Sequence, residues 1–192
     1  MDALVPAFVV ALLAELGDRT QLLAMLLGDR FRKPAAVLAG IALAALLNMA
    51  IAAAVGVEAA TYINHRAIQF MTGVGLILAA SGAAFRVKPA GSTDGWTIGA
   101  FLSSAGAFFI LALGDKTQFV TGAIAAGSGH PLLAAVGAAA GVTIANAPAV
   151  VLGERWPRLV PLRAIRVGAG IVLALAGLYL VIGALGLFGT DN

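Results

Sequence analysis

The sequence predicts an all-α membrane protein in which six transmembrane helices form two three-helix repeats of inverted topology. Three observations lead to this fold class. Hydrophobic residues make up 61% of the 192-residue chain and charged residues 11%, whereas an average soluble domain has about 45–50% apolar residues, glycine included, and about 25% charged residues. Six long apolar stretches occupy most of the chain, and the first half of the sequence recurs in the second half.

The composition also excludes several classes of protein. Too few polar side chains are present to cover a water-soluble enzyme, a nucleic-acid-binding domain or a disordered chain. The chain has no cysteine and only two histidines. Disulfides and thiolate metal sites are therefore excluded, and any bound metal ion must be held mainly by oxygen atoms.

The apolar stretches are each long enough to cross a bilayer, which takes roughly 20 residues. They cover residues 4–27, 35–57, 67–85, 98–124, 132–152 and 164–188. Together they leave no room for a domain outside the membrane, so we expect residues 1–192 to form a single transmembrane domain.

The twelve basic residues predict the orientation. Nine lie in the first, third and fifth connections or just after them, and one lies in the second. The positive-inside rule places the odd-numbered connections in the cytoplasm and both termini outside it. The excess of positive charge is thus a topology signal rather than a sign of nucleic-acid binding. The nine are Arg30, Arg32, Lys33, Arg86, Lys88, Arg155, Arg158, Arg163 and Arg166.

An internal repeat relates the two halves, 1–88 and 97–188. Residues 16–21 (LGDRTQ) recur at 113–118 (LGDKTQ), and Pro34 recurs as Pro131, both 97 positions later. Asn48 matches Asn146 only at an offset of 98, so we expect a local shift of one residue there. Three spans per half reverse the direction of the second half, which is the inverted-repeat architecture of many transporters.

Three carboxylates lie deep in the predicted spans: Glu15, Asp18 and Asp115. An acidic side chain at the centre of a bilayer costs roughly 2.5–3.5 kcal/mol or more and indicates function by default. Glu15 and Asp18 share one helix face at a spacing of three residues, and inversion of the second half brings Asp115 toward them. These carboxylates predict a midplane site for a hard divalent cation.

Further oxygen atoms surround this predicted site, and two bases accompany it. Arg19 and Lys116 each follow a motif aspartate and offset part of its charge. Each base is expected to pair with the opposite half or to point toward an exit. The structural alternative is that these charged residues form salt bridges that only hold the halves together. The two asparagines are either ligands or hydrogen-bonding groups between helices. The candidate additional ligands are Gln21, Gln118, Thr20, Thr117, Asn48 and Asn146.

The motif Glu-x-Gly-Asp-(Lys/Arg)-(Thr/Ser), present once in each three-span half, resembles the signature of the Gdt-type family, also called the transmembrane protein 165 family. Residues 15–20 (ELGDRT) match it fully, whereas the second copy, 112–117 (ALGDKT), has Ala112 in place of glutamate. The resemblance implies a cation/proton antiporter, with Glu15, Asp18 and Asp115 as the cation-binding carboxylates. It covers essentially the whole chain, and the compact two-motif form resembles the bacterial members, which include manganese exporters.

We therefore expect a secondary transporter, not an enzyme, that exports a divalent cation, with manganese favoured, in exchange for protons. Its expected location is the bacterial inner membrane. Its partners are lipid, the transported ion and protons, without nucleic acid or a cofactor, and a homodimer is left open. A calcium/proton exchanger or an exporter of another small cation is the alternative within transport. An intramembrane scaffold or a carboxylate-dyad enzyme is the alternative of another class.

Overall fold

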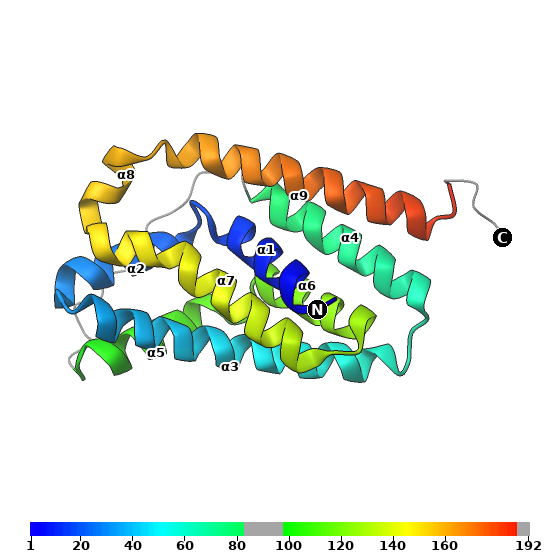
Figure 1. The fold of residues 1–192 in the computed structure, drawn as a ribbon, viewed down its shortest axis with the longest axis horizontal. Coiled ribbons are helices and arrows are strands. Elements are labelled where there is room, and N and C mark those ends of the chain that lie inside the picture. The colour runs from blue at the N-terminus through cyan, green and yellow to red at the C-terminus, as the bar shows by residue number, and fades with distance from the viewer. Residues whose placement is uncertain (83–97, 188–192) are drawn as a thin grey trace.

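A computed structural model of the chain describes residues 1–82 and 98–187, and their regular structure is helical (Figure 1). The first half contains four of the α-helices, and the second half contains five with a short 3-10 turn between α7 and α8. In chain order the helices are α1 (Leu4–Glu15), α2 (Arg19–Phe31), α3 (Pro34–Ala60), α4 (His65–Ser81), α5 (Ala100–Ala112), α6 (Lys116–Ser128), α7 (Pro131–Leu152), α8 (Trp156–Leu159) and α9 (Leu162–Ala184).

Two of the six predicted spans are broken rather than continuous. The span expected over 4–27 is divided into α1 and α2, and the one expected over 98–124 is divided into α5 and α6. At both breaks a leucine is extended, with ψ of 116° and 124°, and the next residue, Gly17 or Gly114, has a φ of 74°. Glycine adopts this left-handed region without the steric cost that a Cβ brings. Each motif glycine therefore lets the helix stop and restart within the predicted span.

The other spans agree more closely with the sequence. Among residues 1–82 and 98–187, three stretches are long and apolar enough to cross a membrane: α3, α7 with its continuation to Leu159, and α9. Helix α4 covers most of the third predicted span, whose last residues, 83–85, lie outside the described residues, as does residue 188 of the sixth. The third connection, with Arg86 and Lys88, also lies outside them.

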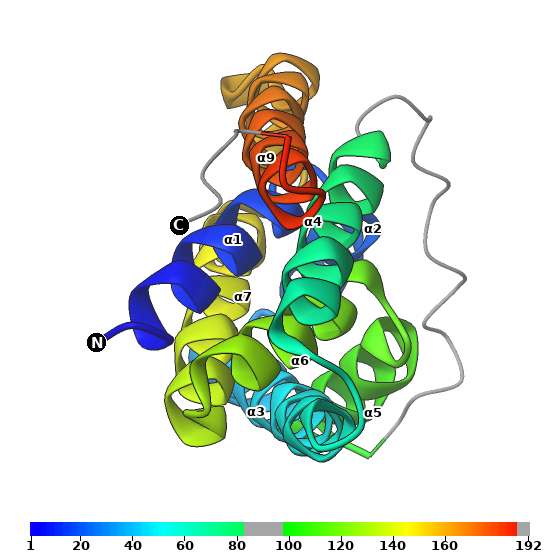
Figure 2. The same cartoon turned by 90° about the vertical axis from the view of Figure 1, so that its right-hand side faces the viewer.

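The helices pack closely through small residues. Helix α3 contacts α5, α6 and α7, α1 contacts α7, and α4 lies along α9 (Figures 1 and 2). Gly40 lies against the carbonyl oxygen of Phe101, and Gly137 lies in the same way against the carbonyl oxygen of Leu4. Gly137 lies 97 positions after Gly40, and Phe101 lies 97 positions after Leu4. The repeat is therefore present in the packing as well as in the sequence. Such small residues allow the close backbone approach typical of membrane helices.

Apolar side chains face outward and polar ones are buried. Leu78, Ile110 and Leu175 are each more than half exposed, whereas Glu15 and Gln21 are 2% exposed. This distribution is the reverse of that in a soluble protein and fits a chain surrounded by lipid. The polar groups inside the bundle gather at the two helix breaks.

Candidate cation site

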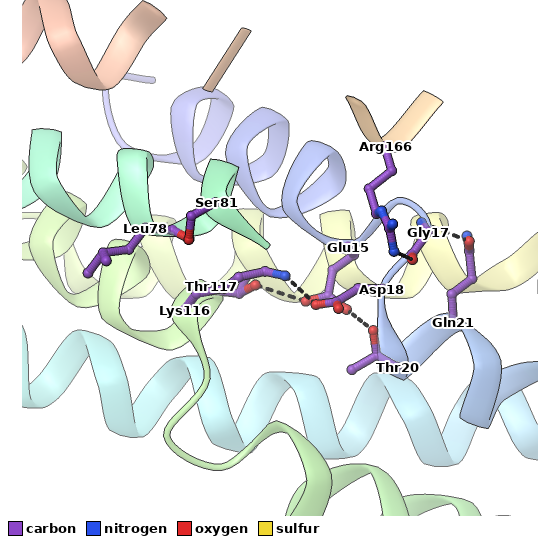
Figure 3. Close-up of polar contacts among 10 residues, drawn as sticks. All are labelled: Glu15, Gly17, Asp18, Thr20, Gln21, Leu78, Ser81, Lys116, Thr117 and Arg166. Carbon is purple, nitrogen blue, oxygen red and sulfur yellow. Dashed lines mark hydrogen bonds and ion pairs between the residues drawn. The ribbon is translucent and has the colours of Figure 1, made fainter. Parts of the chain in front are cut away.

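The two helix breaks face each other across the boundary between the halves, with α1 in contact with α6 (Figure 3). Asp18 and Asp115 occupy the N-cap positions of α2 and α6, but neither side chain forms a capping hydrogen bond. An N-cap aspartate ordinarily uses its carboxylate to bind the backbone of the first helical turn. Here these carboxylates are left for other partners.

Glu15 is held by hydroxyl groups from both halves. Thr20 Oγ1 donates a hydrogen bond to Glu15 Oε2 at 2.5 Å, and Thr117 Oγ1 donates one to Glu15 Oε1 at 2.8 Å (Figure 3). The two threonines occupy equivalent positions, 97 residues apart. One carboxylate therefore joins the two repeats and has a hydroxyl oxygen on each side of it, and these are the kinds of oxygen that bind hard cations.

Asp18 forms an ion pair with Lys116, a residue of the other half (Figure 3). Both side chains are mostly buried, with exposed fractions of 17% and 16%. Of the two predicted arrangements for this base, pairing with the opposite half is the one present. The ammonium group thus occupies a position beside Asp18 where a transported cation would bind.

Asp115 has different surroundings from Asp18. It lines a cavity of about 370 Å³ between α3, α4 and α6, whose walls are mainly apolar. The charges of Arg19 and Lys116 both act on Asp115. The Arg19 side chain is exposed, so the two bases that occupy equivalent positions in the repeat are not used in the same way.

Gln21 and Gln118 hold the broken backbone in place. Their Oε1 atoms accept hydrogen bonds from the N–H groups of Gly17 (3.0 Å) and Gly114 (2.6 Å). Their Nε2 groups donate across the repeat boundary, from Gln21 to the carbonyl of Ala145 at 2.7 Å and from Gln118 to the carbonyl of Asn48 at 3.0 Å. These amides therefore position the site, and their oxygens are already engaged.

The same hydrogen bonds correct the expected shift in the repeat. Ala145 lies 97 residues after Asn48, so the backbone acceptors keep the offset of the rest of the repeat and no shift occurs there. Asn48 and Asn146 are consequently not equivalent. Their Nδ2 groups donate to the carbonyls of Phe109 at 3.2 Å and Val142 at 2.8 Å. Both Oδ1 atoms are buried without a hydrogen-bond partner among the described residues, which leaves them able to accept a cation.

The three carboxylates do not form a compact ligand cluster in this conformation. Among residues 1–82 and 98–187, no three acidic or histidine side chains are close enough together to hold a metal ion. Glu15 is engaged by two threonines, Asp18 is paired with Lys116, and Asp115 faces the cavity. The three charges are near enough to act on one another. Cation binding at all three would require Lys116 to move.

Arg166 is a site neighbour that the sequence analysis counted only as a topology signal. Its Nη1 lies 3.5 Å from the carbonyl oxygen of Gly17, and its Nε is buried without a hydrogen-bond partner within the described part of the chain. A sequence signal was present, because Arg166 stands inside the last predicted span whereas the other bases of that region precede it. Its contact with the first break depends on how α9 packs.

Comparisons with known proteins agree with the repeat and the motif. The sequence model of the family described as "Divalent cation/proton antiporter GDT1" matches residues 3–88 and again 100–187. A Vibrio cholerae serotype O1 protein described as "Putative manganese exporter" is 37% identical over 178 residues, which cover 92% of this chain and 89% of that protein. No solved structure matches the chain. The chain belongs to the GDT1 family of divalent cation/proton antiporters.

Proposed function

We propose that this protein exports a divalent cation, Mn²⁺ first of all, from the cytoplasm in exchange for protons, through a midplane site that includes Glu15, Asp18 and Asp115. One observation supports the proposal: two broken helices from opposite halves place these acidic side chains near enough to act on one another at the boundary between the halves. Broken helices at the repeat interface are where many secondary transporters bind their ions. The similarity to the Vibrio cholerae protein described as "Putative manganese exporter" supports the choice of metal.

Exchange follows from competition for the same oxygens. A divalent cation needs ionised carboxylates, and a proton on any of them weakens the hold on the metal. If the site opens to one side of the membrane at a time, metal leaves where protons are abundant, and the protonated site returns to the other side. Glu15, between two hydroxyl donors, and Asp18, beside Lys116, are each stabilised when no metal is bound.

The proposed topology has six crossing segments, two of them broken helix pairs, arranged as inverted repeats in the bacterial inner membrane. The C-terminal end of α2 and the turn around α8 carry Arg32, Arg155 and Arg158, and these line one common hollow at the same end of the bundle. This end is assigned to the cytoplasm, because basic residues are retained there. Single cysteines in place of Asp2 and Arg32 test the orientation. An impermeant reagent applied to intact cells is expected to label only the first.

Transport itself is tested in inside-out vesicles that contain the purified protein. With the vesicle interior made acidic, Mn²⁺ is expected to accumulate inside and the pH gradient to collapse as it does so. Ca²⁺ and Mg²⁺ are run alongside, since Ca²⁺ uptake that exceeds Mn²⁺ uptake would favour a calcium/proton exchanger. The control is Asp18→Asn, which keeps the side-chain size and removes the charge. Uptake by this variant equal to that of the wild type would refute the proposed site.

A further inference from the structure

The two helix breaks have the same backbone but different surroundings. A Cβ placed on Gly17 would lie 3.1 Å from Arg166 Cβ and 3.2 Å from the Leu162 carbonyl oxygen, because the start of α9 lies on this break. A Cβ placed on Gly114 would meet nothing within 4 Å. One break is therefore covered and the other is open, although the sequence around them is nearly identical.

A cavity connects the open break with one end of the described bundle. The 370 Å³ cavity beside Gly114 and Asp115 extends along α3 and α4 to Ile63, in the connection between these helices. On the other side, the space beside Asp18 is enclosed by Lys116, Arg166 and neighbouring residues, and its volume is about 10 Å³, the size of a single water molecule. The site is thus accessible from the end that holds the α3–α4 connection and closed at the end that holds Arg166.

Helices α4 and α9 form a pair that is packed unequally on the rest of the bundle. Gly73 on α4 and Gly177 on α9 each lie against the other's carbonyl oxygen, and this contact joins the two helices closely (Figure 2). The pair contacts α6 through α4 and contacts α1 through α9. In the repeat, α4 corresponds to α9, α6 to α2 and α1 to α5. Exchanging the two halves would place α9 against α2 and α4 against α5.

We propose that Arg166 closes one entrance to the site, and that in the second conformation the α4–α9 pair tilts so that Gln69, its repeat counterpart, covers Gly114 while Arg166 leaves Gly17. This inference rests on the proposed function, because it assumes that one site serves both sides of the membrane. In the second conformation we expect a cavity beside Gly17. It would be lined by the repeat counterparts of the residues that line the present cavity beside Gly114. Ala52 lines the present cavity, and its counterpart Ala149, which is 0% exposed here, lines the second.

The charge of Arg166 adds electrostatic repulsion to the steric closure of this entrance. A guanidinium group held next to Asp18 and Lys116 repels a metal ion that approaches from that end. Its buried Nε has no hydrogen-bond partner among the described residues, and such a group favours a conformation in which it is solvated. This unpaired atom therefore favours the conformation in which Arg166 leaves Gly17.

The test uses the absence of native cysteines in the chain. Single cysteines at Ala52 and Ala149 report on the present and the second cavity, and a cysteine at Ala45, which is 1% exposed and has no counterpart in either lining, reports on loosening of the fold. An impermeant thiol reagent is applied to right-side-out and inside-out vesicles. With Arg166 in place, we expect the cysteine at Ala52 to react and those at Ala149 and Ala45 to be protected.

Arg166→Gln is expected to raise labelling at Ala149 by about tenfold, the change that follows when a minor conformer becomes a major one, and to lower labelling at Ala52. Arg163→Gln, an exposed arginine on the same helix, is the matched control and should change neither. Labelling that rises at all three cysteines would show a loosened fold, and unchanged labelling at Ala149 would show that Arg166 closes nothing. Either result overturns the proposal.

A second measurement does not depend on the folding of Arg166→Gln. Leu13 on α1 and Gly170 on α9 line the same small space, so a disulfide between cysteines at these positions should lock the present conformation. The cross-linked protein should keep Ala52 reactive, protect Ala149 and stop transport until it is reduced. Transport that continues while cross-linked contradicts the inference. If labelling falls at Ala52 and rises at Ala149 in Arg166→Gln but the wild type takes up no metal, closure by Arg166 is supported and the proposed function is refuted.

Discussion

Lys116 binds Asp18 across the boundary between the two repeats, so the second half of the chain supplies a cation to a carboxylate of the first. Arg19, which occupies the equivalent position in the first motif, is exposed. In the proposed mechanism, the ammonium group of Lys116 therefore competes with the transported ion for Asp18. The two halves of the site therefore differ, although the motifs that form them are nearly identical.

Removing the competitor should strengthen metal binding. We expect Lys116→Gln to bind Mn²⁺ more tightly by on the order of tenfold, about 1.4 kcal/mol, and to release it more slowly, because Asp18 no longer has an internal counter-charge. The measurement is Mn²⁺ affinity by calorimetry on purified protein, together with vesicle uptake. Arg19→Gln is the matched control and should change affinity much less. Equal effects of the two variants would contradict the role given to Lys116.

Removing either motif aspartate should stop transport without preventing insertion. Asp18→Asn and Asp115→Asn keep the side-chain size but remove the negative charge that a divalent ion requires. The check is growth in excess manganese of cells whose only exporter is the variant, with membrane levels of the protein measured in parallel. Wild-type tolerance in either strain would show that the carboxylate in question does not bind the transported ion.

Ala112 ends α5 as Glu15 ends α1, and Thr20 and Thr117 from the two motifs already converge on Glu15. A second carboxylate at this position is therefore expected to join the same site. Ala112→Glu should still insert, bind divalent cations more tightly, and lose affinity more steeply as pH falls, because one more titrating group is coupled to the cluster. Transport should be slower, since release is harder.

The measurement for this prediction is divalent affinity against pH for the wild type and two variants. Wild-type affinity should fall between about pH 8 and pH 5, because protons compete with the metal for the carboxylates. Glu15→Gln should be nearly as damaging as Asp18→Asn, since no second glutamate replaces it. An unaltered affinity and pH slope in Ala112→Glu would show that residue 112 does not face the site.

The two motif glycines should differ in their tolerance of alanine. Gly114→Ala places a Cβ in open space, so its cost is the left-handed backbone alone, roughly 1–2 kcal/mol. Gly17→Ala adds contacts of 3.1 Å with Arg166 Cβ and 3.2 Å with the Leu162 carbonyl oxygen, and should destabilise further. Melting temperatures in detergent compare the two. A larger loss in Gly114→Ala would mean that the first break is not covered as described.

Composition and residue spacing are sufficient to predict where the membrane helices and the internal repeat lie. Apolar stretches of bilayer length located the helices, and the 97-residue repeat related α1–α4 to the second half, because burial in lipid demands long uninterrupted apolar surface. The acidic residues inside such stretches, Glu15, Asp18 and Asp115, indicate a functional site, because burying a charge has a cost that ordinary packing does not explain. These conclusions need no knowledge of which helices touch.

Features that depend on which neighbour a residue contacts require the packing of the helices to be known. A glycine within an apolar stretch can weaken a helix locally, but the complete breaks at Gly17 and Gly114 depend on tertiary contacts, because Gln21 and Gln118 bind the freed backbone there. The sequences of the two motifs are nearly identical, so they do not predict which of the two helix breaks is covered by a neighbouring helix. That difference arises because α9 packs on the first break and α4 leaves the second open. Packing of the α4–α9 pair, rather than local sequence, breaks the symmetry.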